Sequence, residues 1–116
     1  MFDDTFCKLH EKNKEIKMMG IWGKDGLELE RKYFSGAVEI DLELAGAEMA
    51  DIISKLDSLK FSLEKYFIKL HFHGYFLIIF SVTPEYFLML ITNPSIIPGK
   101  LNFYFDLYKH ELIAAL

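Results

Sequence analysis

Two short, almost wholly apolar runs separated by one turn constrain the fold of this chain more than any other feature. The runs are Tyr75–Val82 and Tyr86–Thr92, and Thr83-Pro84-Glu85 lies between them. A membrane-spanning helix needs roughly 20 consecutive apolar residues, and each run is far shorter than that. Short apolar runs bounded by turn residues are typical of strands that are covered on both faces. We therefore predict two central strands of a sheet and no membrane insertion.

The N-terminal part predicts a helix followed by a β-hairpin. Apolar residues recur at helical spacing over Phe2–Asn13, and Ile16–Trp22 is an apolar strand. Asp25-Gly26 then marks the turn, because glycine accepts positive φ angles. The second strand, Leu27–Phe34, is rich in charged side chains. Charges commonly protect edge strands from unwanted pairing, so we expect this strand at the rim of the sheet.

A long amphipathic helix is predicted over Glu39–Leu59. Its apolar residues are spaced by three and four, as in a helix packed on a core. Small residues also gather in it, and they let another backbone approach closely. Two explanations remain open: close packing of the helix on its own sheet, or contact between two helices across a dimer. The apolar stripe comprises Leu42, Ala45, Met49, Ile52, Ile53 and Leu56, and the small residues are Ala45, Gly46, Ala47 and Ala50.

The remaining elements complete an α+β domain. A third strand with alternating side chains is predicted over Phe61–His73, and His73-Gly74 turns the chain into the two central strands. Pro98 suits the first turn of a last helix, which runs to Leu116. Short links make consecutive strands antiparallel. We predict a single domain over residues 1–116 with the order α-β-β-α-β-β-β-α, a five-stranded antiparallel sheet and helices on both faces.

The composition favours a protein partner. Hydrophobic residues make up 52% of the chain, more than a small monomer hides easily, which favours an oligomer. The net charge of -4, with no basic patch, argues against a nucleic-acid partner. Cys7 is the only cysteine; it suits a reducing compartment, and we expect it to be a buried structural thiol. Asp3 and Asp4, with no apolar segment behind them, are unlike a signal peptide, so we expect a cytoplasmic location.

The sequence contains no recognisable catalytic set. His71 and His73 share a strand face and could begin a metal site, but no third ligand is evident and a surface pair is the simpler explanation. His110-Glu111 lacks the spacing of a zinc-protease motif, and no glycine-rich loop is followed by Gly-Lys-Ser/Thr. We therefore expect no enzyme, no metal and no cofactor.

Several segments together carry a family resemblance. They are the hydrophobic first strand, the turn 24–27, the alanine-rich middle helix, the block 69–77 and the final helix 101–116. In this order they resemble the roadblock / dynein light chain 7 family over nearly the whole chain. The longin and profilin-like folds share parts of this architecture.

The resemblance implies a function. Roadblock-like domains commonly form dimers in which the third strands pair across a two-fold axis and the middle helices lie side by side. In bacteria, similar proteins of the gliding-motility regulator type partner a Ras-like GTPase and stimulate its hydrolysis. In eukaryotes and archaea, relatives act as scaffolds or GTPase platforms. The expectation is therefore a non-catalytic homodimer that binds a Ras-like small GTPase.

The candidate contact residues come from the middle helix and the third strand. They are Leu44, Ala47 and Asp51 on the helix and Tyr66 and Ile68 on the strand. The third strand carries large apolar residues and little charge, and an unguarded edge invites pairing. We expect these residues to contact a second copy or a partner.

Arg31 is the only arginine, and GTPase activators often supply one. On a charged strand its expected role is a salt bridge, so activation would come from reorganising the partner's own switch residues. The rivals are a scaffold without effect on hydrolysis, a longin- or profilin-like scaffold, and a small-molecule sensor. The large side chains of Tyr75–Ile91 leave a sensor little room for a cavity. The sequence leaves open the identity of the GTPase and the choice between homodimer and heterodimer.

Overall fold

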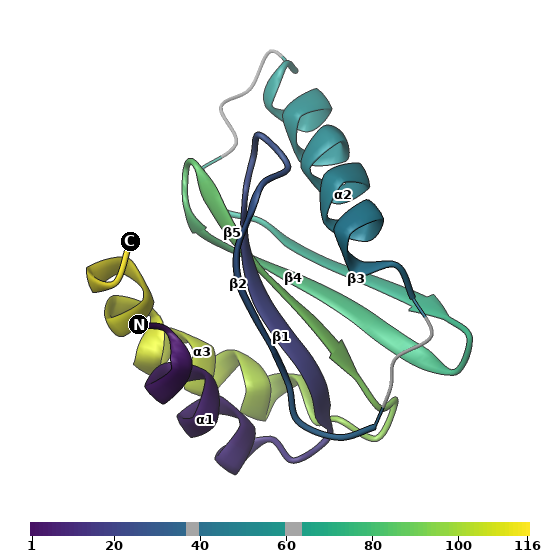
Figure 1. The fold of residues 1–116 in the computed structure, drawn as a ribbon, viewed down its shortest axis with the longest axis vertical. Helices are drawn as coiled ribbons and strands as arrows, with labels where there is room; N and C mark the ends of the chain where they lie inside the picture. The colour runs from purple at the N-terminus through teal and green to yellow at the C-terminus, as the bar shows by residue number, and fades with distance from the viewer. Residues whose placement is uncertain (37–39, 60–63) are drawn as a thin grey trace.

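The computed structural model describes residues 1–36, 40–59 and 64–116, which form a five-stranded antiparallel sheet with three helices (Figure 1). The strand order across the sheet is β2-β1-β5-β4-β3. The predicted α+β class and element order are confirmed. In chain order the elements are α1 (Asp3–Lys12), β1 (Ile16–Gly23), β2 (Glu28–Tyr33), α2 (Leu42–Asp57), β3 (Phe67–Phe72), β4 (Tyr75–Thr83), β5 (Tyr86–Thr92) and α3 (Pro98–Ala114).

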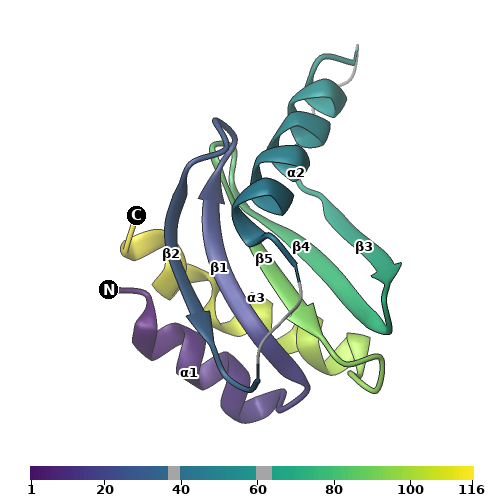
Figure 2. The same ribbon diagram turned by 45° about the vertical axis from the view of Figure 1, so that its right-hand side comes forward.

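The helices cover both faces of the sheet, as predicted. Helices α1 and α3 pack on one face and α2 packs on the other (Figures 1 and 2). Side chains of each strand alternate between the two cores: on β5, Leu88 and Leu90 lie under α1 and α3, whereas Phe87 and Met89 lie under α2. Strands β4 and β5 are interior and mostly buried, which confirms the prediction from their apolar runs.

A glycine sets how closely α2 approaches the sheet. A Cβ on Gly46 would lie 2.6 Å from Cδ1 of Trp22, closer than real side chains come. The Trp22 indole is fully buried, so α2 can pack over β1 here only because Gly46 has no side chain. This decides part of the question about the small residues. Gly46 and Ala50 pack on the chain's own sheet, whereas Ala47 is exposed.

Two predicted boundaries were too generous. Helix α2 begins at Leu42 because Asp41 caps it: the Asp41 side chain accepts a hydrogen bond of 3.1 Å from the N–H of Leu44. Glu39, where the helix was predicted to start, lies outside the described residues, as do residues 60–63 at the predicted start of the third strand. Strand β3 begins only at Phe67. Within the described residues, no helix has both the length and the apolar character that crossing a membrane requires.

Candidate interaction surface

Strand β3 is the outermost strand on one side of the sheet (Figure 2). Its sequence is Phe-Ile-Lys-Leu-His-Phe, and Lys69 is its one lysine, arginine or acidic residue. Phe67 and Leu70 are 46% and 42% exposed. An apolar edge with unpaired backbone groups is a template for another strand.

Backbone hydrogen bonds reveal which residues of β3 face the open edge. The N–H of Ser81 donates to the carbonyl of Tyr66 at 3.1 Å, and the N–H of Tyr66 donates to Oγ of Ser81 at 3.0 Å. Tyr66 thus directs its backbone groups toward β4. In an antiparallel pair this direction alternates along the strand. Phe67, Lys69 and His71 therefore direct their N–H and C=O groups outward.

The β3–β4 turn supports this assignment. His73 and Gly74 have φ angles of 46° and 78°, and they join Phe72 to its partner Tyr75. Two central residues with positive φ are typical of a type I′ hairpin turn. Such a turn closes on a hydrogen-bonded pair, so Phe72 faces β4 and His71 faces outward.

Open grooves lie on both faces of β3. The groove on the α2 face has a volume of about 370 Å³, and the groove on the α3 face has a volume of about 390 Å³. A strand added to β3 would place its side chains over both. The first groove is lined by residues that include Ala45, Glu48, Met49, Leu70 and Phe72. The second is lined by residues that include Phe67, Phe80, Asn102, Phe105 and Asp106.

The predicted helix residues are exposed but do not all face β3. Leu44, Ala47 and Asp51 lie on the solvent side of α2. Ala47 turns toward the β1–β2 hairpin, since a Cβ on Gly26 would lie 3.6 Å from the Cα of Ala47. The flank beside β3 carries Ala45 and Glu48 instead. Helical periodicity identifies a buried stripe, but it does not tell which flank lies next to which strand.

The predicted strand residues are half-buried. Tyr66 and Ile68 pack against the core under α2. Burial raises the pKa of Tyr66 to about 12, with a smaller contribution from the charge of Asp57, so the phenol stays protonated at neutral pH. Leu70 shares their face, because alternate residues of a strand do, and it is more exposed. That alternation was visible in the sequence, but Leu70 was not among the predicted contact residues.

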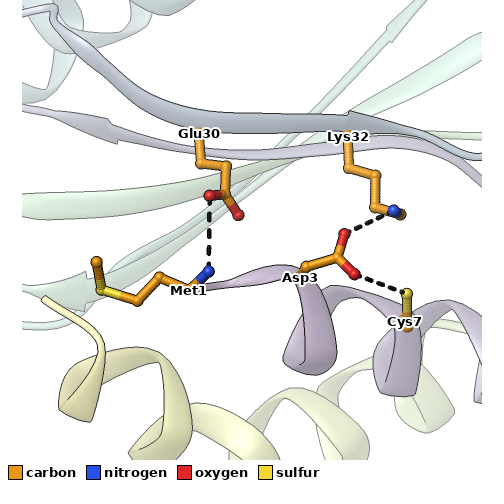
Figure 3. Close-up of polar contacts among 5 residues, drawn as sticks. All are labelled: Met1, Asp3, Cys7, Glu30 and Lys32. Atoms are coloured by element: carbon orange, nitrogen blue, oxygen red, sulfur yellow. Dashed lines mark hydrogen bonds and ion pairs between the residues drawn. The ribbon is translucent and has the colours of Figure 1, made fainter.

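The opposite edge of the sheet, β2, forms ion pairs with the N-terminus of the chain and with α1. The N-terminal ammonium of Met1 lies 4.0 Å from Oε1 of Glu30, and Nζ of Lys32 lies 2.6 Å from Oδ1 of Asp3 (Figure 3). The hydrogen bond from Lys32 lowers the pKa of Asp3. The prediction that this charged strand lies at the edge of the sheet is confirmed.

Arg31 also lies on β2 and is engaged in an ion pair. Its Nε lies 3.1 Å from Oε1 of Glu28, and its side chain is only 26% exposed. The predicted salt bridge of Arg31 is therefore present. Its position on β2 separates it from the open edge by the full width of the sheet.

Cys7 contradicts its prediction. It is exposed on α1, with Sγ 3.8 Å from Oδ2 of Asp3 (Figure 3). Helix α1 buries Phe6 and Leu9, and the residue that follows Phe6 turns away from the sheet. The expectation of a buried structural thiol was wrong, because only one face of α1 packs on the core and Cys7 lies on another face.

The histidines do not assemble a metal centre in the part of the chain that the structure describes. The His71 ring lies 4.2 Å from the Phe76 ring, centroid to centroid, and His73 occupies the turn. Within residues 1–36, 40–59 and 64–116, no group of three or more His, Cys, Asp or Glu side chains could hold a metal ion. The pair therefore gains no third ligand from those residues.

Solved structures with the same architecture include several bacterial proteins. MglC from Myxococcus xanthus has a TM-score of 0.65 and 19% identity, covering 99% of this chain and 98% of its own. A Roadblock/LC7 domain from Streptomyces avermitilis has a TM-score of 0.75 and 8% identity, covering 97% and 95%. The gliding protein MglB from Thermus thermophilus has a TM-score of 0.74 and 11% identity, covering 92% and 82%. The chain therefore has the roadblock/LC7 fold, as its pattern of elements predicted.

The likeness is one of fold. No protein-family model matches the sequence, and no curated protein is significantly similar to it. A chain of the LokiProfilin2/rabbit actin complex also matches, with a TM-score of 0.62 and 16% identity over 99% of this chain and 97% of its own. The profilin-like architecture considered from the sequence is thus related but superposes less well than the Roadblock/LC7 domain.

Proposed function

We propose that this chain is a non-catalytic, dimeric regulator or scaffold that binds a Ras-like small GTPase. The observation that carries the proposal is the apolar outer edge of β3 in a domain with the roadblock/LC7 fold. The structural similarity to the gliding protein MglB supports a regulatory role. The resemblance of the sequence pattern to the roadblock family implies the same role.

Dimerisation would use β3 and the neighbouring flank of α2. Pairing of β3 with a second copy would satisfy the outward backbone groups and continue the sheet from one copy to the next. It would also cover the α2-face groove, with Ala45, Leu70 and Phe72 as central contacts. Tyr66 and Ile68 would contribute the part of their surface that remains exposed. The dimer would thereby hide apolar side chains that a monomer leaves in water.

The GTPase would bind on the outer side of α2. Leu44 is 55% exposed there, and Asp51 and Lys55 form an ion pair one turn apart with Nζ and Oδ2 separated by 2.9 Å. An exposed leucine framed by charges suits the centre of a protein contact, since such contacts combine an apolar anchor with a polar rim. The face carries no arginine, because the chain's only arginine lies on β2, so stimulation of hydrolysis would act through the switch residues of the GTPase.

The first test is the solution mass by light scattering at several protein concentrations. A mass near twice 13.6 kDa supports the dimer. Binding is then measured with the purified Ras-like GTPase of the source organism, loaded with GDP or with a non-hydrolysable GTP analogue. Binding to neither form contradicts the proposal.

Single-turnover GTP hydrolysis separates an activator from a scaffold. Binding that leaves the rate unchanged identifies the scaffold. For an activator, the Arg31→Ala variant should retain its effect, because Arg31 is paired with Glu28 far from the β3 edge. A near-total loss of stimulation would instead show that Arg31 acts as an arginine finger.

A further inference from the structure

Lys69 occupies the centre of the open edge. Its backbone N–H and C=O are directed outward, and its side chain lies on the α1/α3 face, where β3 residues oppose Ile78 and its neighbours on that face. The ammonium lies 4.1 Å from the centre of the Phe76 ring, a cation–π contact that holds the lysine over the sheet. Within β3 its charge has no acidic neighbour to balance it.

Two-fold symmetry limits how β3 can pair with a second β3. The strands must run antiparallel, and one residue must lie opposite its own copy on the axis. Four residues can occupy the axis and keep at least three residues of β3 paired on each strand: Ile68, Lys69, Leu70 or His71. Each choice pairs the outward residues differently.

The Lys69-centred register forms the most backbone hydrogen bonds. It pairs Phe67 with His71 of the second copy, His71 with Phe67, and Lys69 with Lys69, so every outward residue of β3 has a partner. The Leu70-centred register leaves Phe67 opposite the turn, and the Ile68-centred register places His71 opposite Lys65, before the start of β3. The His71-centred register leaves both Phe67 and Lys69 without a partner in β3. Each additional hydrogen bond favours association by about 2- to 10-fold.

The same register has a cost that the alternatives avoid. Two Lys69 side chains lie directly opposite each other on one face, and like charges in that position oppose pairing by about 1.5- to 5-fold. Two extra hydrogen bonds outweigh this repulsion, so the Lys69-centred register prevails. The repulsion nevertheless remains in the dimer of identical chains.

We propose that Lys69 lies on the two-fold axis and weakens self-association, so that β3 pairs more tightly with an apolar edge strand that carries a carboxylate at the matching position. The preferred occupant of the edge is then a second roadblock-like chain with an acidic residue opposite Lys69. This inference rests on the β3 pairing of the proposed function and specifies the chemistry of its partner.

The Lys69→Glu variant is the probe for such a partner. One version of the chain carries a tag of different mass, and equal amounts of wild type and K69E are mixed and examined by native mass spectrometry. The mixed dimer should exceed the statistical half of all dimers, and its dissociation constant should be about 3- to 10-fold below that of either pure dimer. The neutral variant K69M should dimerise about 2- to 5-fold more tightly than wild type.

Lys65→Glu is the matched control. It makes the same change of charge on the same segment, four residues away, at an exposed position. Four strand residues span about 13 Å, which is beyond the screening length at physiological salt. A mixture of wild type and K65E should show no preference. An equal preference in both mixtures would overturn the inference, because it would then reflect net charge alone.

Cysteine cross-linking tests the register directly in a Cys7→Ser background. Residues 68 and 70 of opposite copies form a closely spaced pair in the Lys69-centred register. A mixture of I68C and L70C should therefore form an intermolecular disulfide on mild oxidation, whereas L70C alone should not. Cross-linking of L70C alone would overturn the register while leaving the dimer of the proposed function intact. A monomer in every variant and at every concentration would reject both.

Discussion

The two edges of this sheet differ in the side chains that they present to another strand. Strand β2 is lined with charges; it contacts α1 through the Asp3–Lys32 ion pair and the chain's N-terminus through the Met1–Glu30 pair. Strand β3 has no such cover in the described residues and carries one lysine among large apolar side chains. Charged side chains thus line one edge, and the proposed association uses the other.

The backbone of β2 can be assigned in the same way as that of β3. The N–H of Phe34 donates to the carbonyl of Lys17 at 2.8 Å, so this pair is hydrogen-bonded. Alternation then directs the backbone groups of Arg31 and Tyr33 outward. Both edges therefore direct backbone groups outward, and among the described residues the difference between the edges lies in their side chains and in α1.

A proline at each edge should separate the two roles, with the largest expected effect. Lys69→Pro removes an outward N–H of β3 without touching the β3–β4 ladder, and prolines are tolerated at such positions. The loss of one hydrogen bond per copy at the axis should weaken the dimer by about 4- to 100-fold, and the removal of the Lys69–Lys69 repulsion should recover only about 1.5- to 5-fold of this. Sedimentation or light scattering over a concentration series measures the change.

Arg31→Pro is the corresponding change at β2. Its N–H also points outward, so the variant should fold and dimerise like wild type. A dimer that survives K69P but dissociates in R31P would reverse the assignment of the edges. Far-UV circular dichroism of both variants checks that the monomer fold is kept.

Gly46→Ala tests what positions α2 beside the open edge. A methyl group would overlap the buried Trp22 indole, and overpacking of this kind costs about 1–3 kcal/mol of unfolding free energy. Urea unfolding measures the loss. Gly99→Ala is the control, because a Cβ there has nothing within 4 Å and alanine favours the helix. Equal stability of G46A and wild type would mean that α2 does not depend on this close approach.

Removing the charges of β2 should create a second associating edge. In Glu30→Val/Lys32→Val, exposed ion pairs worth about 0–1 kcal/mol are lost, so the monomer should remain folded. Light scattering should detect species larger than the dimer. The control K8L/E111L removes an ion pair of 2.7 Å between α1 and α3, away from either edge. It should form no species larger than the dimer. Unchanged mass in the β2 variant would show that α1, and not charge, closes this edge.

The sequence predicted what depends on periodicity and local chemistry. The apolar runs placed β4 and β5 inside the sheet, and the charges of β2 placed it at the rim. Asp-Gly and His-Gly marked two of the hairpin turns, and both glycines adopt positive φ. These features follow from short segments, so they could be predicted without knowledge of the tertiary arrangement.

Features that depend on contacts between distant segments could not be predicted from the sequence pattern. Ala47 was predicted to contact a partner; it is exposed, but it lies beside Gly26 of the first hairpin and not beside β3, and the sequence pattern did not predict that position. Cys7 was expected inside, but the narrow contact of α1 leaves it exposed. The outward direction of the Lys69 backbone groups was inferred from the hydrogen bond between Ser81 and Tyr66, which lie on neighbouring segments of the sheet. In each case the deciding contact lies on another element.

Acid should loosen the guarded edge slightly, through His10. The ring of His10 stacks on Phe34, just after β2, with centroids 4.1 Å apart and planes at 10°. Burial lowers the pKa of His10 from its ordinary 6.5, and Lys14 adds to the effect. The unfolded chain therefore takes up the proton first, and stability falls as the pH drops below 6.5 until the folded protein also binds the proton. One proton limits the slope to about 1.4 kcal/mol per pH unit.

Urea unfolding at about pH 7.5, 6.5 and 5.5, which bracket the ordinary histidine pKa, measures this decline. The free energy of unfolding should fall for wild type and fall less for His10→Gln. The exposed His110→Gln is the control and should follow wild type. Identical slopes in wild type and H10Q would assign the acid sensitivity to other groups and leave the stacking of His10 on Phe34 without a measurable part in closing the β2 edge.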